Sequence, residues 1–456
     1  MTNENILGSR PIPELLLKFA VPSVISMLVN SIYNLVDQIF IGQGVGYLGN
    51  AATNVAFPFV TLSMAVALMI SVGTAANVGL NLGGGRQEEA DRTLGNGFML
   101  AVIAGTLILL IGEIFMVPLL HLFGATETVL PYAIDYTRIY LIGLPFITIG
   151  IMINDEIRAD GNPGYAMRSM LLGAAINIVC DPLFIFVFKW GVRGAALATI
   201  MGQFATMICC IRYLNKFRTL NFRKENLKLK GSVVKNITAL GLSSFITQIA
   251  MLFMQVVMNR QAVKYGALSK YGSDIPLTVF GIVMKINQIM MSVIMGITTG
   301  SQPIFSFNYG ARKFKRVKSL VKTVVAACTV VGVCGMLVLQ TFPQQIINIF
   351  GQEDALYNEF AVMCLKNMTV FIFVMGVQMT ASVYFQAVGK PVGATILSLS
   401  RQILFMIPCL MILPVFFGIK GVMWSFPVSD ILCVTLGFFM LLSEMKNLNK
   451  NICAAE

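Results

Sequence analysis

The chain has 456 residues, of which 56% are apolar and only 12% are charged. Soluble globular proteins carry about 25% charged residues, so this composition excludes a soluble multidomain protein and indicates one that lies in a membrane. The formal net charge of +12 would suit nucleic-acid binding, but it would equally suit basic loops on the cytoplasmic side of a membrane.

Nearly uncharged stretches of about 20 residues or more recur along the chain, and each is long enough to cross the hydrocarbon core as a helix. The N-terminal stretch begins too polar for a cleaved signal peptide, so we expect the first of these stretches to be a true span. Breaks at Gly, Pro and charge clusters predict twelve spans near residues 14–42, 52–81, 94–121, 131–157, 164–188, 193–214, 234–263, 275–306, 317–341, 356–387, 391–416 and 419–443.

An even number of spans places both termini on one side of the membrane. Most Lys and Arg residues fall in the loops and span ends of that side, including the basic stretch 212–230. By the positive-inside rule, both termini are expected to be cytoplasmic, in a multi-pass protein of the cytoplasmic membrane. The positive charge then orients the chain, so we expect membrane lipids and no nucleic acid among its partners.

Loop motifs of the first half recur in the second half at an offset of about 227 residues. The sequence GVRG at 191–194 matches GIKG at 418–421, and GGR at 84–86 matches GAR at 310–312. Six spans per half let both halves enter the membrane in the same orientation, as two pseudo-symmetric six-helix bundles of an all-α polytopic protein. We expect an N-terminal lobe at 1–214, a cytoplasmic basic linker at 215–232 and a C-terminal lobe at 233–456.

Two facing bundles enclose a cleft that can open to each side in turn, which is typical of carriers. The phosphate-binding pattern G-x-x-x-x-G-K-[ST] of an ATP-driven pump does not occur in the sequence. No H-E-x-x-H pattern occurs either, and the single histidine has no catalytic partner in the sequence, so an enzyme is not expected. An ion gradient is then expected to drive uphill transport, without a cofactor.

Two acids lie well inside predicted spans, in the half of the membrane far from the termini: Asp37 and Asp181. A carboxylate in hydrocarbon is costly unless it is paired, hydrated or protonated, so both are functional candidates. Asn177 lies four residues before Asp181 on the same helix face, and Tyr136 and Thr199 reach a similar depth. These oxygens could bind Na⁺ or a proton, or they could fix helix packing by hydrogen bonds.

The residue after Asp181 adds a further oxygen. Pro182 removes a backbone hydrogen bond, which would free a carbonyl oxygen for an ion or for water. If Na⁺ is the coupling ion, we expect it at Asp37, Asn177, Asp181 and Thr199.

Charged residues also lie inside or at the ends of other spans. Arg401 and Asp430 fall near the middle of adjacent spans, where an ion pair is the favoured interpretation. Asp135 and Arg138 are spaced to pair on one helix face. The cytoplasmic end of the fourth span carries Asp155, Glu156 and Arg158, which indicates a structural or gating network.

Three residues of the seventh and eighth spans are candidates for the substrate cleft: Met258, Lys285 and Met291. The flexible thioether of Met suits ligands of varied shape. Most Met and aromatic side chains of the chain are nonetheless expected to pack against helices or face lipid, and Lys285 could instead pair with an acid.

The sequence resembles the multidrug and toxic compound extrusion (MATE) family, most nearly its MepA-type bacterial branch, along nearly the whole chain. The resemblance is carried by the segments PELLLKFAVPSVISMLVNSIYNLVDQIFIG, IRADGNPGYAM, NIVCDPLFIF with GVRGAALATI after it, and GSQPIFSFNYGARKFKRV. It implies the MATE/MOP fold, a V-shaped pair of six-helix bundles that extrudes drugs in exchange for H⁺ or Na⁺. The family's cation site in the first lobe would fall on Asp37, Tyr136, Asn177, Asp181 and Thr199.

Some members of this family use acids of the seventh and tenth spans instead. Here those spans offer Gln255 and Gln378, with no carboxylate in either interior. This departure concentrates the expected ion coupling in the first lobe and leaves Gln255 as a candidate for the substrate cleft.

Residues and resemblance together predict a monomeric cation-coupled antiporter that exports drugs, mostly organic cations, by alternating access. The alternative is a lipid-linked oligosaccharide flippase of the same superfamily, which would favour a strongly cationic cleft. The sequence leaves H⁺ and Na⁺ open as the coupling ion, because both would use the same oxygens.

Overall fold

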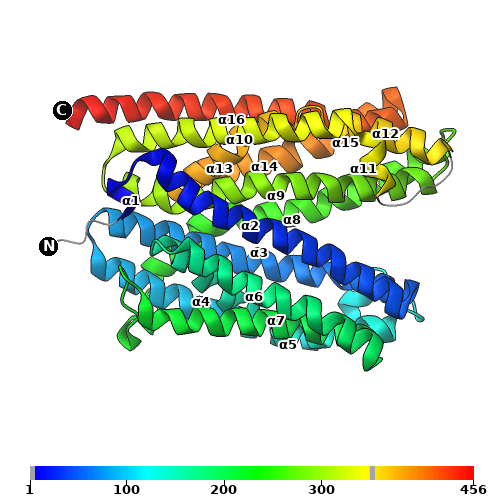
Figure 1. Cartoon of the computed structure of the whole chain (residues 1–456), viewed down its shortest axis with the longest axis horizontal. Helices are drawn as coiled ribbons and strands as arrows, with labels where there is room; N and C mark the ends of the chain where they lie inside the picture. Colours follow the sequence, from blue (N-terminus) through cyan, green and yellow to red (C-terminus); the bar gives the residue numbers. More distant parts are fainter. Residues whose placement is uncertain (1–5, 350–354, 456) are drawn as a thin grey trace.

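Twelve helical segments long and apolar enough to cross a membrane run through the computed structural model, which describes residues 6–349 and 355–455 (Figure 1). The first six spans are built from α2 (Ile12–Val45), α3 (Tyr47–Gly83), α4 (Gln87–Leu122), α5 (Leu130–Ala159), α6 (Pro163–Pro182) with the π-helical turn η1 (Leu183–Val187), and α7 (Gly191–Tyr213). The short helix α1 (Ile6–Ser9) precedes them. We call α1–α7 the first lobe.

The second lobe follows a linker that contains two short 3₁₀ turns, η2 (Leu214–Lys216) and η3 (Lys224–Leu227). Its helices are α8 (Gly231–Ala267), α9 (Asp274–Gly310), α10 (Phe314–Thr341), α11 (Pro343–Asn348), α12 (Ala355–Thr369), η4 (Ile372–Val374), α13 (Met375–Ala387), α14 (Pro391–Leu399), η5 (Ser400–Met406), α15 (Ile407–Phe417) and α16 (Ile419–Ala455). No strand occurs among the described residues, so the predicted all-α membrane fold is confirmed.

Each predicted span overlaps one observed span, but several helices are longer than predicted. The third span was predicted from residue 94, whereas α4 begins at Gln87 and carries Glu88 and Glu89 in its first turn. Charge marks the edge of the hydrocarbon, but backbone hydrogen bonds continue the helix into water, where acids at its N-terminus are favourable. Hydropathy therefore locates the spans and misplaces their ends.

Glycines at corresponding turns, including Gly161-Asn162-Pro163 and Gly389-Lys390-Pro391, have similar φ angles in the two lobes. Gly161 and Gly389 have φ angles of 91° and 79°, and Gly191 and Gly418 have φ angles of 56° and 58°. Only glycine enters this left-handed region without a steric penalty, so the same turns require the same residue in both halves. The repeat in the sequence thus reflects repeated turn geometry.

The two lobes are joined most tightly at the end of the molecule where α1 and the end of α16 lie, which we call the terminal side (Figure 1). There, Leu7, Leu15 and Phe19 of the first lobe share one apolar cluster with α9, α10, α13 and α16. On the opposite, far side, the lobes have separate apolar clusters, one around Phe59 and one around Phe360. In Figure 1, α2 crosses obliquely from one bundle to the other.

Close backbone contact at glycines holds the terminal side together. A Cβ atom on Gly241 of α8 would lie 1.7 Å from the carbonyl oxygen of Met69 on α3, and one on Gly83 of α3 would lie 2.0 Å from the carbonyl oxygen of Phe307 on α9. Nearer the middle of the helices, Ser31 and Ser292 add a hydroxyl contact of 2.6 Å between α2 and α9. The absence of side chains at these glycines lets the lobes approach backbone to backbone.

Candidate cation site

Four helices of the first lobe carry the five side chains predicted to bind a cation: Asp37 on α2, Tyr136 on α5, Asn177 and Asp181 on α6, and Thr199 on α7. Asp181 is fully buried, and its carboxyl group is a near neighbour of that of Asp37. The Nδ2 atom of Asn177 donates to Oγ1 of Thr199 over 3.4 Å. The structure therefore gathers the acids, the amide and the hydroxyl.

Several oxygens of this site lack a hydrogen-bond partner. Oδ1 of Asp37, Oδ1 of Asn177 and both carboxylate oxygens of Asp181 are buried with no donor from another residue. Most buried polar atoms in proteins are hydrogen-bonded, and two adjacent carboxylates repel each other unless a positive charge or a shared proton intervenes. A small cation or a proton would satisfy these oxygens, and Na⁺ takes such carboxylate, amide and hydroxyl ligands.

Small residues and an irregular turn bring these helices together. A Cβ atom on Gly202 of α7 would lie 2.5 Å from the carbonyl oxygen of Gly173 on α6, so α6 and α7 pack closely where Asn177 reaches Thr199. Pro182 removes the amide that would bond one turn back, and the chain widens there into the π turn η1. A missing backbone donor next to Asp181 is thus built into the helix.

Two tyrosines belong to the same site and were not predicted from the sequence. Tyr33 lies one turn before Asp37 on α2 and close to Asp181 and to Gln203 of α7. Tyr140 stacks on Tyr136, with ring centroids 6.2 Å apart and an interplanar angle of 10°. The spacing of four residues that links each tyrosine to a predicted site residue was the signal that could have found them.

The four candidates for a substrate cleft occupy different environments in the second lobe. Met258 is buried inside the apolar cluster of the far side, and Met291 is buried in the cluster that joins the lobes. Gln255 is half-buried and donates to Oδ1 of Asn259 over 3.2 Å, while Lys285 is exposed. Only Gln255 and Lys285 thus reach a surface in this conformation.

The charged pairs differ from each other in quality. Arg401 and Asp430 do pair, with Nε and Oδ1 separated by 4.0 Å, but neither atom has a hydrogen bond. The predicted pair of Asp135 and Arg138 is wrong. Asp135 instead binds Arg193 of α7 over 2.8 Å, and Arg138 binds Glu113 of α4 over 3.5 Å, because neighbouring helices bring partners that a single helix face cannot reveal.

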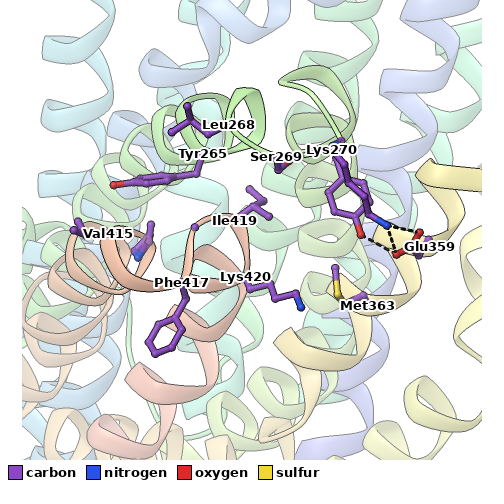
Figure 2. Close-up of a pocket in the computed structure, with 13 residues that line it drawn as sticks. Tyr265, Leu268, Ser269, Lys270, Glu359, Met363, Val415, Phe417, Ile419 and Lys420 are labelled. Carbon is purple, nitrogen blue, oxygen red and sulfur yellow. Dashed lines mark hydrogen bonds and ion pairs between the residues drawn. The ribbon is translucent and has the colours of Figure 1, made fainter.

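A separate pocket of about 600 Å³ lies at the far end of the second lobe, between the α8–α9 loop, α12 and the α15–α16 turn (Figure 2). Lys270 and the Tyr271 hydroxyl both bind Oε1 of Glu359, over 2.8 and 3.0 Å. The hydrogen bond to this carboxylate raises the pKa of Lys270. The pocket belongs to the other lobe from the paired aspartates, so it is a distinct feature of the surface.

The family model MatE matches this chain over residues 22–183 and 239–412. The multidrug export protein MepA of Staphylococcus aureus (strain bovine RF122 / ET3-1) is 25% identical over 426 residues, which cover 93% of this chain and 92% of that protein. The protein of the same name from Staphylococcus haemolyticus (strain JCSC1435) is 26% identical over 433 residues, which cover 94% and 93%.

Solved transporter structures share the fold. The outward-facing conformation of a multidrug resistance MATE family transporter of the MOP superfamily superposes with a TM-score of 0.93 over 99% of both chains, at 23% identity. A MOP superfamily transporter from Pyrococcus furiosus, for which a binding pocket of reverse polarity suggested a different function, gives a TM-score of 0.92 at 23% identity, over 98% of this chain and 99% of that one.

Proposed function

The chain belongs to the MatE family, and from this premise we infer that it is a multidrug efflux transporter, the function for which the similar MepA proteins are named. We propose further that H⁺ or Na⁺ drives the export of organic, mostly cationic, compounds by alternating access. The protein then acts in the cytoplasmic membrane as a monomer, without enzymatic activity and without a cofactor other than the coupling ion.

One observation supports cation coupling above all others: the adjacent carboxyl groups of Asp37 and Asp181, with buried oxygens that no other residue satisfies. Binding of a proton or of Na⁺ removes the repulsion between the two carboxylates and joins α2 to α6. Loss of the ion restores that repulsion. An ion that binds one arrangement of these helices better than another shifts the balance between conformations, and a drug that prefers the other arrangement is then released.

The packing of the lobes supports a direction for this exchange. The lobes share an apolar cluster on the terminal side and have separate clusters on the far side, an arrangement suited to a conformation that opens to the far side. The basic linker and loops lie on the terminal side, which the positive-inside rule assigns to the cytoplasm. Ions then enter the site from outside the cell, and drugs leave to the outside through the same opening.

The flippase alternative is less favoured by the charges of the second lobe. A pyrophosphate-linked substrate requires several unpaired cations in the cleft, as anionic phosphates do generally. Arg401 and Lys285 are the two cations within the spans of the second lobe that could serve this role, and the charge of Arg401 is offset by Asp430 at 4.0 Å. Transport of a glycolipid between leaflets, measured beside dye efflux, separates the two functions.

The deciding experiment is ethidium efflux from proteoliposomes that contain the purified protein, with pH and Na⁺ gradients imposed separately. We expect export to accelerate when the driving ion is more concentrated on the far side of the protein. An acceleration by only one gradient identifies the coupling ion. Equal efflux under both gradients and under none would contradict cation coupling.

A further inference from the structure

Lys285 lies on the side of α9 that faces the first lobe. Nearer the terminal side, this side of α9 touches α2, because Ser292 meets Ser31 over 2.6 Å. One turn farther along, a Cβ atom on Gly296 would lie 2.5 Å from the Cα atom of Val24. Lys285 comes seven residues before Ser292, which is two helical turns, so it extends from the same face of the helix. The contact face of α9 therefore continues to Lys285 toward the far side.

The facing surface of α2 continues in the same way. Gln38 comes seven residues after Ser31, so Gln38 and Lys285 each lie about 10 Å beyond the serine contact, one on each lobe. Both side chains are exposed, and a Cβ atom on Gly281, one turn farther along α9, would meet nothing within 4 Å. The two faces touch at the serines and have separated at this depth. Lys285 is therefore exposed to the space between the lobes, which is the expected place of the substrate cleft.

No acid neutralises Lys285 within the part of the chain that the structure describes. Its ammonium group has neither an ion pair nor a hydrogen bond there. The acid beside Gln38 is Asp37, which lies against Asp181 inside the first lobe. A lone ammonium group inside a span is costly in lipid, and such groups face water-filled cavities and mark substrate pathways. Lys285 is thus a cation that is free to bind a ligand.

Neutral amides accompany this cation on the wall of the second lobe. Gln288 is exposed one turn from Lys285 on α9. On α8, Gln255 donates to Oδ1 of Asn259 over 3.2 Å. Asn259 comes eighteen residues after Gly241, which is five helical turns, so it lies on the face of α8 that contacts α3 nearer the terminal side. This wall therefore offers a positive charge together with groups that can hydrogen-bond to uncharged parts of a ligand.

An ammonium group binds a carboxylate through a charge-assisted hydrogen bond, which is stronger than a neutral one. We propose that Lys285 determines substrate specificity by binding an anionic group of the substrate. Among the organic cations that the protein exports, the cleft then prefers zwitterions that also carry a carboxylate. One ammonium group suffices for one carboxylate, whereas a pyrophosphate requires several cations. The proposal rests on the drug export proposed above and names the substrate class for it.

Rhodamine B and its ethyl ester are a matched pair of probes. Both dyes carry the same cationic ring system, and only rhodamine B has a free carboxylate. The purified full-length protein is reconstituted in proteoliposomes, and KM and the maximal rate of export are measured for each dye under the gradient that drives ethidium export. We expect the wild type to have a several-fold lower KM for rhodamine B than for the ester. Equal KM values, or a lower KM for the ester, overturn the proposal.

Lys285→Met removes the charge and keeps an unbranched side chain. We expect KM for rhodamine B to rise about tenfold, the effect of losing one charge-assisted hydrogen bond, and KM for the ester to stay within about twofold. Lys285→Arg keeps the charge and should keep the preference for rhodamine B. The matched control is Lys366→Met. Lys366 is an exposed lysine of α12, a second-lobe helix that packs against α9 and α16, and its loss should leave both KM values unchanged.

An equal change of KM for both dyes in Lys285→Met would show that the residue acts on transport as a whole, and it would overturn the proposal. An unchanged KM for rhodamine B in that variant overturns it as well. If Lys285→Met does not fold, Lys285→Gln takes its place with the same expectations. Failure of the wild type to export either dye or ethidium under any gradient would instead contradict the proposed function. Fluorescence anisotropy of the two dyes with the purified proteins would then still decide whether Lys285 binds the carboxylate.

Discussion

Two carboxyl groups side by side in a membrane are a poor choice for packing alone. Asparagine at the positions of Asp37 and Asp181 could both donate and accept hydrogen bonds, and two neighbouring amides would not repel each other. A role in packing therefore gives no reason for two acids. The stacked pair Tyr136 and Tyr140 limits the space beside them. At the scale of single residues, the arrangement makes physical sense as a site that alternates between charged and neutralised states.

Asp37→Asn and Asp181→Asn should each abolish ethidium efflux and leave the abundance of the protein in the membrane unchanged, because the amide keeps the shape and loses the ion. The measurement is dye efflux from cells, with membrane abundance followed by immunoblot. Asp135→Asn is the control, since this partly exposed acid binds only the exposed Arg193 and should retain efflux. Wild-type efflux in either test variant would remove that aspartate from the mechanism.

Among the elements, the linker is held to the first lobe by the buried side chains of Asp91, Asn96 and Asp160. The Asp160 side chain accepts hydrogen bonds from the backbone amides of Arg218 and Thr219, from the Thr219 hydroxyl and from the Tyr213 hydroxyl. Such charge-assisted bonds are stronger than neutral ones. The linker therefore acts as an attached part of the first lobe, although its basic composition alone suggests a flexible connection.

Asp160→Ala should loosen the linker around Arg218 and Thr219, because four donors lose their shared acceptor. We expect the first lobe to lose about 1–3 kcal/mol of stability and trypsin to cleave the linker several times faster. Cleavage is measured by gel electrophoresis of the purified protein. Glu225→Ala, at an exposed linker position, should cleave at the wild-type rate, and equal rates in all three proteins would show that Asp160 does not anchor the linker.

For the whole molecule, the contact between the lobes depends on bare backbone. Gly241 meets Met69 and Gly83 meets Phe307 at distances that exclude any side chain. Interfaces between membrane helices gain most of their energy from close van der Waals packing, and glycines allow the closest approach. Closure of the terminal side is thus sensitive to a single added methyl group.

Gly241→Ala should weaken closure of the terminal side by about 1–3 kcal/mol, the usual cost of overpacking. Hydrogen exchange in α3 and α8 near Met69 and Gly241 should become faster, and dye efflux should fall because the closed state is less populated. Gly281→Ala is the control, because nothing lies within 4 Å of a Cβ atom at that glycine. Equal exchange in both variants would contradict a role of Gly241 in closure.

The sequence by itself determined the membrane class, the twelve spans and the repeated halves, and it singled out two aspartates inside the membrane. These follow from local properties: the hydropathy of a segment sets whether it enters the membrane, and depth within a span marks a carboxyl group as unusual. The resemblance carried by the motifs then indicated the family, which the comparisons confirm. Its assignment of site residues and of the lobe boundaries stays a prediction.

Only the tertiary structure decided which residues meet. It joined Asp135 to Arg193 rather than to Arg138, added Tyr33 to the site, and left Glu156 buried without a partner. The reason is that the distance between two helices is set by both of their surfaces, by glycine contacts and by irregular turns such as η1. A periodic pattern in one segment records which face is apolar, but it carries no information about the side chain that arrives from the next helix.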